Sequence, residues 1–338
     1  MADLAVRVGA LELKNPVVCA SSEATMTSEG LRAAVDAGAA AVVAKSTNES
    51  DAAKRQLDSA EYLLLDERWT PLPPGSPGRG ASLFNRSGLV GEPFERWVET
   101  VTAADAYASG RDAYVVGSLI PADLDELVRM ASAFEEAGIR WLEVNLSASH
   151  GEEAATGAIE LVRDADRVEE VIGRVRTAVA LPVTAKLPAH GDVLDLVAAA
   201  LDAGADSICL VGRQLGFLPD VATRRPFLGT FGAIGGGWAL PLTLRWVAKA
   251  RLRFGADVPI VATNGIRDGL DVARSLLAGA SAAELATAVW TDGFGVLAHA
   301  LAELDEYLER EGLAASELVG EATDAVMTYE EAGVRRSG

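Results

Sequence analysis

Hydrophobic residues along the chain fall into short continuous runs that alternate with longer amphipathic stretches. Eight of the short runs have the length of a strand buried on both faces, at about 16–20, 41–45, 114–118, 141–145, 182–186, 207–211, 259–263 and 282–286. Between most of them, apolar residues at helical spacing predict helices over 27–37, 124–137, 168–179, 193–203 and 268–278. This alternation indicates a parallel sheet with helical crossovers.

The predicted helices share one termination signal. An Ala-Gly pair closes each of four helices shortly before the next apolar run, at Gly38, Gly138, Gly204 and Gly279. Eight such strand–helix units predict a single (β/α)8 TIM barrel domain over residues 1–338. A doubly wound sheet alternates in the same way, but the first turn, Ala20-Ser21-Ser22-Glu23, lacks the Gly-x-Gly-x-x-Gly pattern of dinucleotide-binding turns.

Two segments are much longer than ordinary connections between strands and helices. They span residues 46–113 and 212–258, and both contain clusters of proline or glycine. Long loops in a compact domain usually cover or line a functional site. We therefore expect both to be inserted at the carboxyl-terminal face of the barrel, where active sites of this fold lie.

Composition narrows the range of partners and compartments. The chain has 30 basic and 49 acidic residues, a net charge of −19, which argues against nucleic acid as a partner. Cys19 and Cys209 both lie in apolar runs, which favours neither a disulfide framework nor a cysteine-clustered metal site. The first residues do not resemble a signal peptide, and charges interrupt every apolar stretch before the roughly 18 residues of a membrane span. We expect a cytoplasmic protein with no membrane partner.

Candidate chemistry appears where the predicted strands end. Lys45 and Lys186 each terminate an otherwise apolar run, and a buried ammonium without a partner is costly. Either an anionic or electron-rich ligand lies beside these lysines, or a buried carboxylate such as Glu143 pairs with them. The three histidines are too scattered to predict a metal site, at His150, His190 and His299.

The turns after the seventh and eighth strands have the features of a phosphate site. Thr263-Asn264-Gly265 and Ala286-Thr287 are small residues that expose backbone N–H groups, and the first turn leads into a predicted helix. The glycines at 235–237 can approach the same group. These turns occupy the usual phosphate-binding position of a TIM barrel.

Several of these segments, in their order and spacing, resemble one known family. The segments run from Leu13 to about Gly312 and include Lys14-Asn15-Pro16, Lys45-Ser46, Ser82-Leu83-Phe84-Asn85, Asn145-Leu146-Ser147, Lys186-Leu187-Pro188, Asn264-Gly265-Ile266 and Gly279-Ala280. They resemble the dihydroorotate dehydrogenases, FMN-dependent TIM-barrel enzymes, and the soluble fumarate-type branch more than the membrane-associated one.

The resemblance implies a cofactor and a set of site residues. FMN or active-site contacts fall on Ala20, Ser21, Lys45, Ser46, Asn85, Asn145 and Lys186. The FMN phosphate falls on Gly235, Gly236, Asn264, Gly265, Ala286 and Thr287. Substrate contacts fall on Asn85, Gly88, Leu89, Asn145, His150 and Arg213. It also implies hydride transfer at flavin N5, with Lys186 stabilising the anionic reduced flavin, a homodimer and no metal.

The substrate side departs from the family pattern. Members carry Asn-Leu-Ser-Cys-Pro-Asn, or its serine version, where this chain has Asn-Leu-Ser-Ala-Ser-His at 145–150. Ala148 therefore stands in place of the base, His150 in place of a pyrimidine-binding asparagine, and Gly212-Arg213 in place of an Asn-Ser or Asn-Thr pair. Arg213 offers a clamp for a carboxylate or phosphate.

These departures predict an FMN-dependent oxidoreductase that acts on a small anionic substrate other than dihydroorotate. Lys45, Lys186, Ser149 and His150 are the candidate catalytic residues, with His150 either a base or a binding residue. The alternatives are a true dihydroorotate dehydrogenase with Ser149 or His150 as base, and a barrel that has lost catalysis and binds flavin or nothing.

Overall fold

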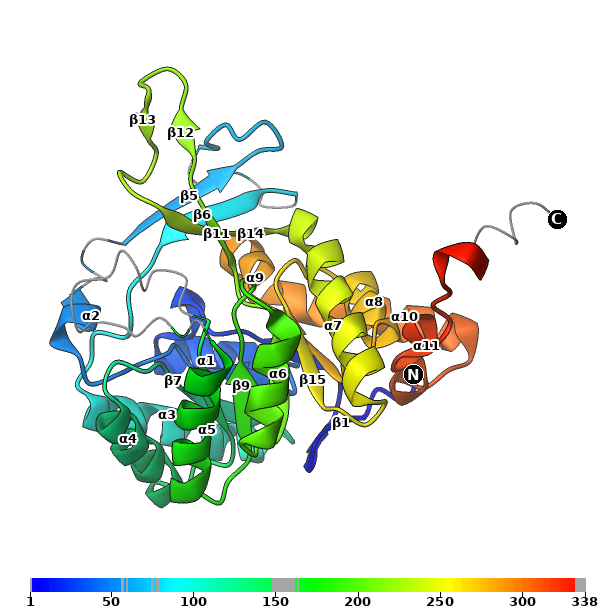
Figure 1. Cartoon of the computed structure of the whole chain (residues 1–338), viewed down its shortest axis with the longest axis horizontal. Helices are drawn as coiled ribbons and strands as arrows, with labels where there is room; N and C mark the ends of the chain where they lie inside the picture. The colour runs from blue at the N-terminus through cyan, green and yellow to red at the C-terminus, as the bar shows by residue number, and fades with distance from the viewer. Residues whose placement is uncertain are drawn as a thin grey trace.

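The structure of the chain, a computed structural model, describes residues 2–55, 58, 60–73, 76, 80–147, 162 and 164–331. Its central feature is a closed barrel of parallel strands surrounded by helices (Figure 1). Going round the barrel, the strands are β3 (Val17–Cys19), β4 (Ala41–Val43), β7 (Tyr114–Leu119), β8 (Leu142–Asn145), β9 (Val183–Lys186), β10 (Ser207–Leu210), β15 (Ile260–Thr263) and β16 (Ala282–Leu285). The predicted (β/α)8 TIM barrel is confirmed, and all eight strand predictions coincide with these strands.

The helices around the barrel begin and end as their sequences dictate. They are α1 (Ser28–Asp36), α3 (Phe94–Ser109), α4 (Leu124–Glu136), α5 (Ala165–Ala178), α6 (Val193–Asp202), α7 (Leu240–Phe254), α8 (Gly269–Leu277) and α10 (Gly295–Glu311). Five start at a side-chain oxygen that accepts a first-turn backbone N–H, from Thr27, Asp123, Asp164, Asp192 and Asp268. The four predicted Ala-Gly terminators all adopt positive φ, as the signal requires.

The two long segments contain a sheet of their own. Residues 46–113 include α2 (Asp51–Arg55), β5 (Glu61–Leu65) and β6 (Ser82–Arg86), and residues 212–258 include β11 (Gln214–Gly216), β12 (Pro219–Asp220), β13 (Arg225–Pro226), β14 (Gly232–Gly236) and η3 (Gly237–Ala239). Antiparallel pairing joins them in the order β11-β14-β6-β5. This sheet lies over one end of the barrel, and the β12–β13 hairpin projects beyond it (Figure 1).

A short hairpin packs at the opposite end. Strands β1 (Val6–Val8) and β2 (Leu11–Leu13) pair antiparallel around Gly9, whose φ is +59°. A Cβ on Gly9 would lie 2.9 Å from the backbone oxygen of Asp206, which directly precedes β10. The hairpin therefore closes the amino-terminal end of the barrel and leaves the carboxyl-terminal end for the site.

The remaining described elements are short. They are η1 (Glu23–Thr25), α9 (Thr287–Asp292), η4 (Ala315–Leu318) and α11 (Glu321–Asp324). Arg251 of α7 pairs with Asp324 at 2.7 Å and so holds α11 against the barrel. Among the described helices, none combines the length and the apolar character needed to cross a lipid bilayer.

Candidate active site

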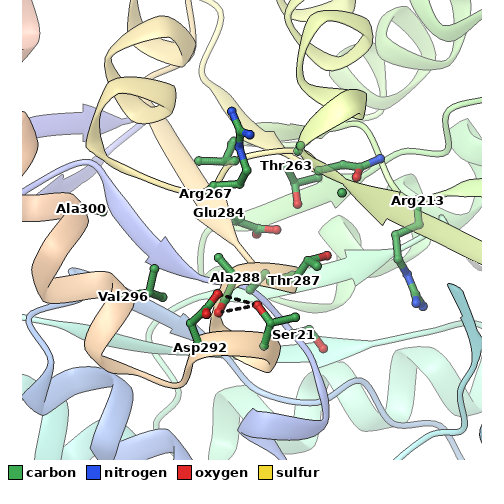
Figure 2. A pocket seen from close by; sticks show the side chains of 18 of the residues that line it. Ser21, Arg213, Thr263, Arg267, Glu284, Thr287, Ala288, Asp292, Val296 and Ala300 are labelled. Carbon is green, nitrogen blue, oxygen red and sulfur yellow. Dashed lines mark hydrogen bonds between the residues drawn. The ribbon is translucent and has the colours of Figure 1, made fainter. Parts of the chain in front are cut away.

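A cavity of about 1020 Å³ opens at the carboxyl ends of the barrel strands. Its labelled wall residues come from different strands and loops (Figure 2). Most of the predicted site residues line it, namely Ala20, Ser21, Lys45, Ser46, Gly88, Leu89, Asn145, Lys186, Arg213, Gly236, Asn264, Gly265, Ala286 and Thr287. Asn85 and Gly235 contact lining residues: Asn85 accepts a hydrogen bond from Arg213, and Gly235 approaches Asn264. Ala148, Ser149 and His150 fall outside the described residues.

Three segments predicted to hold a phosphate meet at one side of the cavity. A Cβ on Gly235 of β14 would lie 3.0 Å from Asn264 Oδ1 and 3.6 Å from Thr287 Oγ1. Asn264 and Gly265 both have positive φ, of 79° and 93°, and a Cβ on Gly265 would lie 2.3 Å from the backbone nitrogen of Leu240. Small residues are therefore required for these backbones to approach one another.

A cation at this cradle was missed by the sequence interpretation. The Arg267 side chain lines the cavity (Figure 2), and a Cβ on Gly237 would lie 2.6 Å from Arg267 Nη1. Asp271 accepts from Arg267 Nε at 2.9 Å and orients the guanidinium. Backbone N–H groups, a hydroxyl and a guanidinium together form a setting suited to a phosphate.

Lys45 pairs with a carboxylate that the sequence interpretation had not singled out. Its Nζ lies 2.6 Å from Glu23 Oε1. The backbone N–H of Lys45 donates to the carbonyl of Thr25 in η1, which holds the end of β4 beside Glu23. Burial opposes the ionisation of Glu23, but the charge and hydrogen bond of Lys45 outweigh it and lower the Glu23 pKa to about 2. Burial also lowers the pKa of Lys45, and Glu23 partly offsets this effect.

Arg213 extends from the end of β10 toward the sheet above the barrel. Its Nη1 donates to Asn85 Oδ1, and its Nη2 donates to Ser87 Oγ at 3.4 Å. Burial lowers the Arg213 pKa, while the nearby Glu23 carboxylate raises it. The Asn85 amide nitrogen is buried and has no hydrogen-bond partner within the described residues. A polar ligand at this wall would satisfy it.

Lys186 lies between two buried carboxylates. Its Nζ is 2.7 Å from Glu284 Oε2 and 3.4 Å from Glu143 Oε2. The carboxylate pairing left open by the sequence is thus observed, and Lys186 and Glu284 also line the cavity. Burial, reinforced by Glu284 and opposed by Lys186, raises the pKa of Glu143 to about 7. The two carboxylates outweigh the effect of burial on Lys186 and raise its pKa.

The same cluster brings Glu143, Cys209 and Glu284 within 4.8 Å of one another. The Lys186 ammonium already supplies positive charge to both carboxylates, and burial raises the pKa of the Cys209 thiol well above its usual value. A protonated thiol is a poor metal ligand. We therefore assign no metal to this part of the structure. The sequence alone could have singled out Glu284 as a candidate site residue, because it is the single acidic residue of an apolar predicted strand.

Comparisons with known proteins agree with this geometry. The family model for dihydroorotate dehydrogenase matches residues 74–308. The catalytic subunit of dihydroorotate dehydrogenase B (NAD(+)) from Thermoplasma acidophilum is 28% identical over 313 residues, covering 92% of this chain and 95% of that protein. The proteins of the same name from Pyrococcus abyssi and Methanopyrus kandleri are 30% identical over 320 residues (94% and 98%) and 32% identical over 303 residues (86% and 88%). The chain therefore belongs to the dihydroorotate dehydrogenase family, and it is an oxidoreductase.

Proposed function

We propose that the chain binds FMN and transfers a hydride between a small anionic substrate and flavin N5. The observation that carries this proposal is a cavity at the strand ends, lined by the phosphate-cradle residues, the buried Lys45 and Lys186, and the half-buried Arg213. One cradle without a dinucleotide fingerprint favours a mononucleotide over FAD or NAD.

The chain's own residues fit FMN. Gly236, Asn264, Gly265 and Thr287 would hold the phosphate, with Arg267 beside them. Lys186 would lie at an electron-rich edge of the ring system, and Glu284 would moderate its charge. When bound, FMN supplies the hydride acceptor. The protein orients it and places cations where negative charge develops.

The substrate proposal rests on Arg213. Together with Lys45 and Glu23, it gives this wall two cations and one carboxylate, which favours an anion. A Cβ at position 212 would lie 2.5 Å from Ser147 Cβ, so an asparagine has no room there without rearrangement. With Ala148 at the position of the base, these features favour a substrate other than dihydroorotate.

The names of the relatives favour a second candidate, dihydroorotate itself, with Ser149 or His150 as base. Anaerobic mixing of the flavin-loaded protein with dihydroorotate and with a panel of small carboxylic acids separates the two. We expect dihydroorotate to reduce the flavin about 10²–10⁴-fold more slowly than the acid that fits the cavity. Faster reduction by dihydroorotate would establish the second candidate. A bound flavin that no acid reduces would indicate a non-catalytic barrel.

Variants refine the substrate test. Arg213→Gln should weaken binding of the anionic substrate about 10-fold or more, the cost of losing a charge-assisted hydrogen bond, whereas Arg224→Gln on the exposed hairpin should not.

Ala148→Cys should produce little dihydroorotate activity, because Arg213 remains in the pocket. Strong gain of activity in Ala148→Cys would show that only the base had been lost.

We also propose with which subunits the chain assembles and in which compartment it works. The relatives are named as catalytic subunits of NAD(+) enzymes, so a second subunit and NAD+ as electron acceptor are candidates beside the homodimer implied by the family. Light scattering of the purified chain distinguishes a monomer from a dimer. The two buried free cysteines fit a reducing cytoplasm.

A further inference from the structure

Three serines connect the cavity to a carboxylate inside the barrel. Ser21 Oγ lies 3.5 Å from Ser46 Oγ, Ser46 Oγ lies 2.9 Å from Ser118 Oγ, and Ser118 Oγ donates to Glu143 Oε1 at 3.0 Å. These residues belong to β3, β4, β7 and β8 or to the turns after them, which are neighbours in the barrel. Ser21 and Ser46 line the cavity, whereas Ser118 is 0% exposed and Glu143 is 1% exposed. We call Ser21, Ser46 and Ser118 the serine row.

The hydrogen-bond partners give the serine row one direction. An ionised Glu143 only accepts, so Ser118 donates to it and must accept from Ser46. The single hydroxyl proton of Ser46 is then committed, and Ser46 Oγ accepts from Asn145 Nδ2 at 3.3 Å and from Ser21. Ser21 Oγ accepts from the Ser46 backbone N–H at 3.2 Å. Every hydroxyl proton therefore points from the cavity toward Glu143.

The groups around Glu143 make it able to receive a proton. Lys186 from β9 lies closer to Glu284 of β16 than to Glu143, so its one positive charge leaves the second carboxylate incompletely neutralised. Cys209 from β10 stays protonated because burial raises its pKa, and β7 contributes the Ser118 hydroxyl. Burial, with repulsion from Glu284, raises the pKa of Glu143 to about 7.

We propose that the serine row conducts a proton from the cavity to Glu143, which serves as the proton acceptor of the reaction. The inference rests on the proposed function, because a two-electron oxidation removes a hydride and a proton from the substrate. FMN, when bound, would supply the hydride acceptor, and the proton needs a base on this chain. The row supplies one where Ala148 cannot.

The proton balance closes along the row. Ser21 Oγ takes the substrate proton as its own proton passes to Ser46, the Ser46 proton passes to Ser118, and the Ser118 proton passes to Glu143 Oε1. Each hydroxyl ends neutral, and the Glu143 carboxylate becomes a carboxylic acid. Glu143 and Ser118 act through Ser21 and do not touch the substrate.

The pH dependence of single-turnover flavin reduction tests the proposal. In the wild type the rate should rise as Glu143 ionises, with a midpoint near 7, and then level off. Glu143→Gln should remove this rise and lower the plateau about 10²-fold or more. Ser118→Ala should do the same, while Ser118→Thr, which keeps the hydroxyl, should restore the rise. If His150→Asn removes the rise and Glu143→Gln keeps it, the proposal is wrong.

Infrared titration of the flavin-free protein gives a readout that does not need the reaction. A carboxylic acid band that titrates near pH 7 should be present in the wild type and missing in Glu143→Gln, because exposed acids titrate about three units lower. Ser118→Ala should raise the midpoint of this band, since the donor that favours the ionised form is lost, and Ser118→Thr should not. The proton-transfer proposal is wrong if the wild type shows no such band, or if Ser118→Ala leaves the midpoint of the band unchanged. Either result would count against it even if the protein reduces flavin. Failure to bind or reduce flavin refutes the proposed function instead.

Discussion

At the scale of residues, the main feature of this barrel is a set of lysine–carboxylate contacts at the strand ends, in which one lysine is shared by two buried carboxylates. Lys45 is held by Glu23, and Lys186 is shared by Glu143 and Glu284. The lone lysines at strand ends were visible in the sequence. Glu143 was weighed as a partner from the sequence, and it lies 3.4 Å from Lys186. Glu23 and Glu284 were not singled out, because only the folded barrel brings η1 to Lys45 and β16 to Lys186.

Lys186 tests this balance directly. Lys186→Met removes the counter-charge of two buried carboxylates and should cost about 3–5 kcal/mol of unfolding free energy at pH 8. The loss should be smaller at pH 5, where Glu143, whose pKa burial raises, can take up a proton instead. Denaturant unfolding at both pH values measures it, with the exposed Lys249→Met as control. An equal loss at both pH values would mean that packing, and not charge, explains the effect.

Glu143 makes a separate prediction for stability. Its pKa rises from 4.5 unfolded to about 7 folded, so the folded state binds the proton more tightly. This contribution is fully present below pH 4.5 and is lost as the pH rises through 7. Replacement by glutamine removes the dependence.

Glu143→Gln should therefore gain stability relative to the wild type between pH 5 and pH 8, by up to about 3 kcal/mol. Denaturant unfolding of both proteins across this range measures the difference. A Glu143→Gln variant whose stability follows the wild type in parallel from pH 5 to pH 8 would show that Glu143 ionises normally in the folded state.

At the scale of helices and strands, the spacing of hydrophobic residues predicted those elements whose signals are local in the sequence. The strands of the barrel are continuous apolar runs, and the helices between most of them carry caps and glycine terminators, so both were predictable. The sheet over the barrel was not. Its central pair, β6 with β14, joins residues far apart in the chain, such as Phe84 with Ile234, and such partners leave no local signal.

Gly265 tests whether the turn after β15 builds the phosphate cradle. Gly265→Ala combines positive φ with a contact of 2.3 Å to the Leu240 backbone, and should lower FMN affinity about 10-fold or more while costing about 1–3 kcal/mol of stability. Gly255→Ala is the matched control, since Gly255 has φ +100° and open space around it. Fluorescence titration with FMN compares them. Equal affinity in the two variants would remove this turn from the cradle.

On the scale of the whole molecule, the positively charged side chains at the cavity contrast with the net negative charge of the chain. A protein of net charge −19 places Lys45, Lys186 and Arg213 around one cavity at the strand ends. The overall charge repels anions at long range, so recognition of an anionic ligand must come from short-range contacts inside the cavity. The family resemblance located this cavity from sequence. The way Arg213 engages Asn85 and Ser87 required the fold.

The cofactor is the most direct test of the account. The protein should be purified, its visible spectrum recorded, and any bound cofactor released with acid and identified by chromatography. The account predicts the spectrum of an oxidised flavin and one equivalent of FMN, because the described residues form one proposed phosphate cradle in a cavity that also holds Lys45 and Lys186. Release of FAD, or no flavin bound even after reconstitution with FMN, would contradict it.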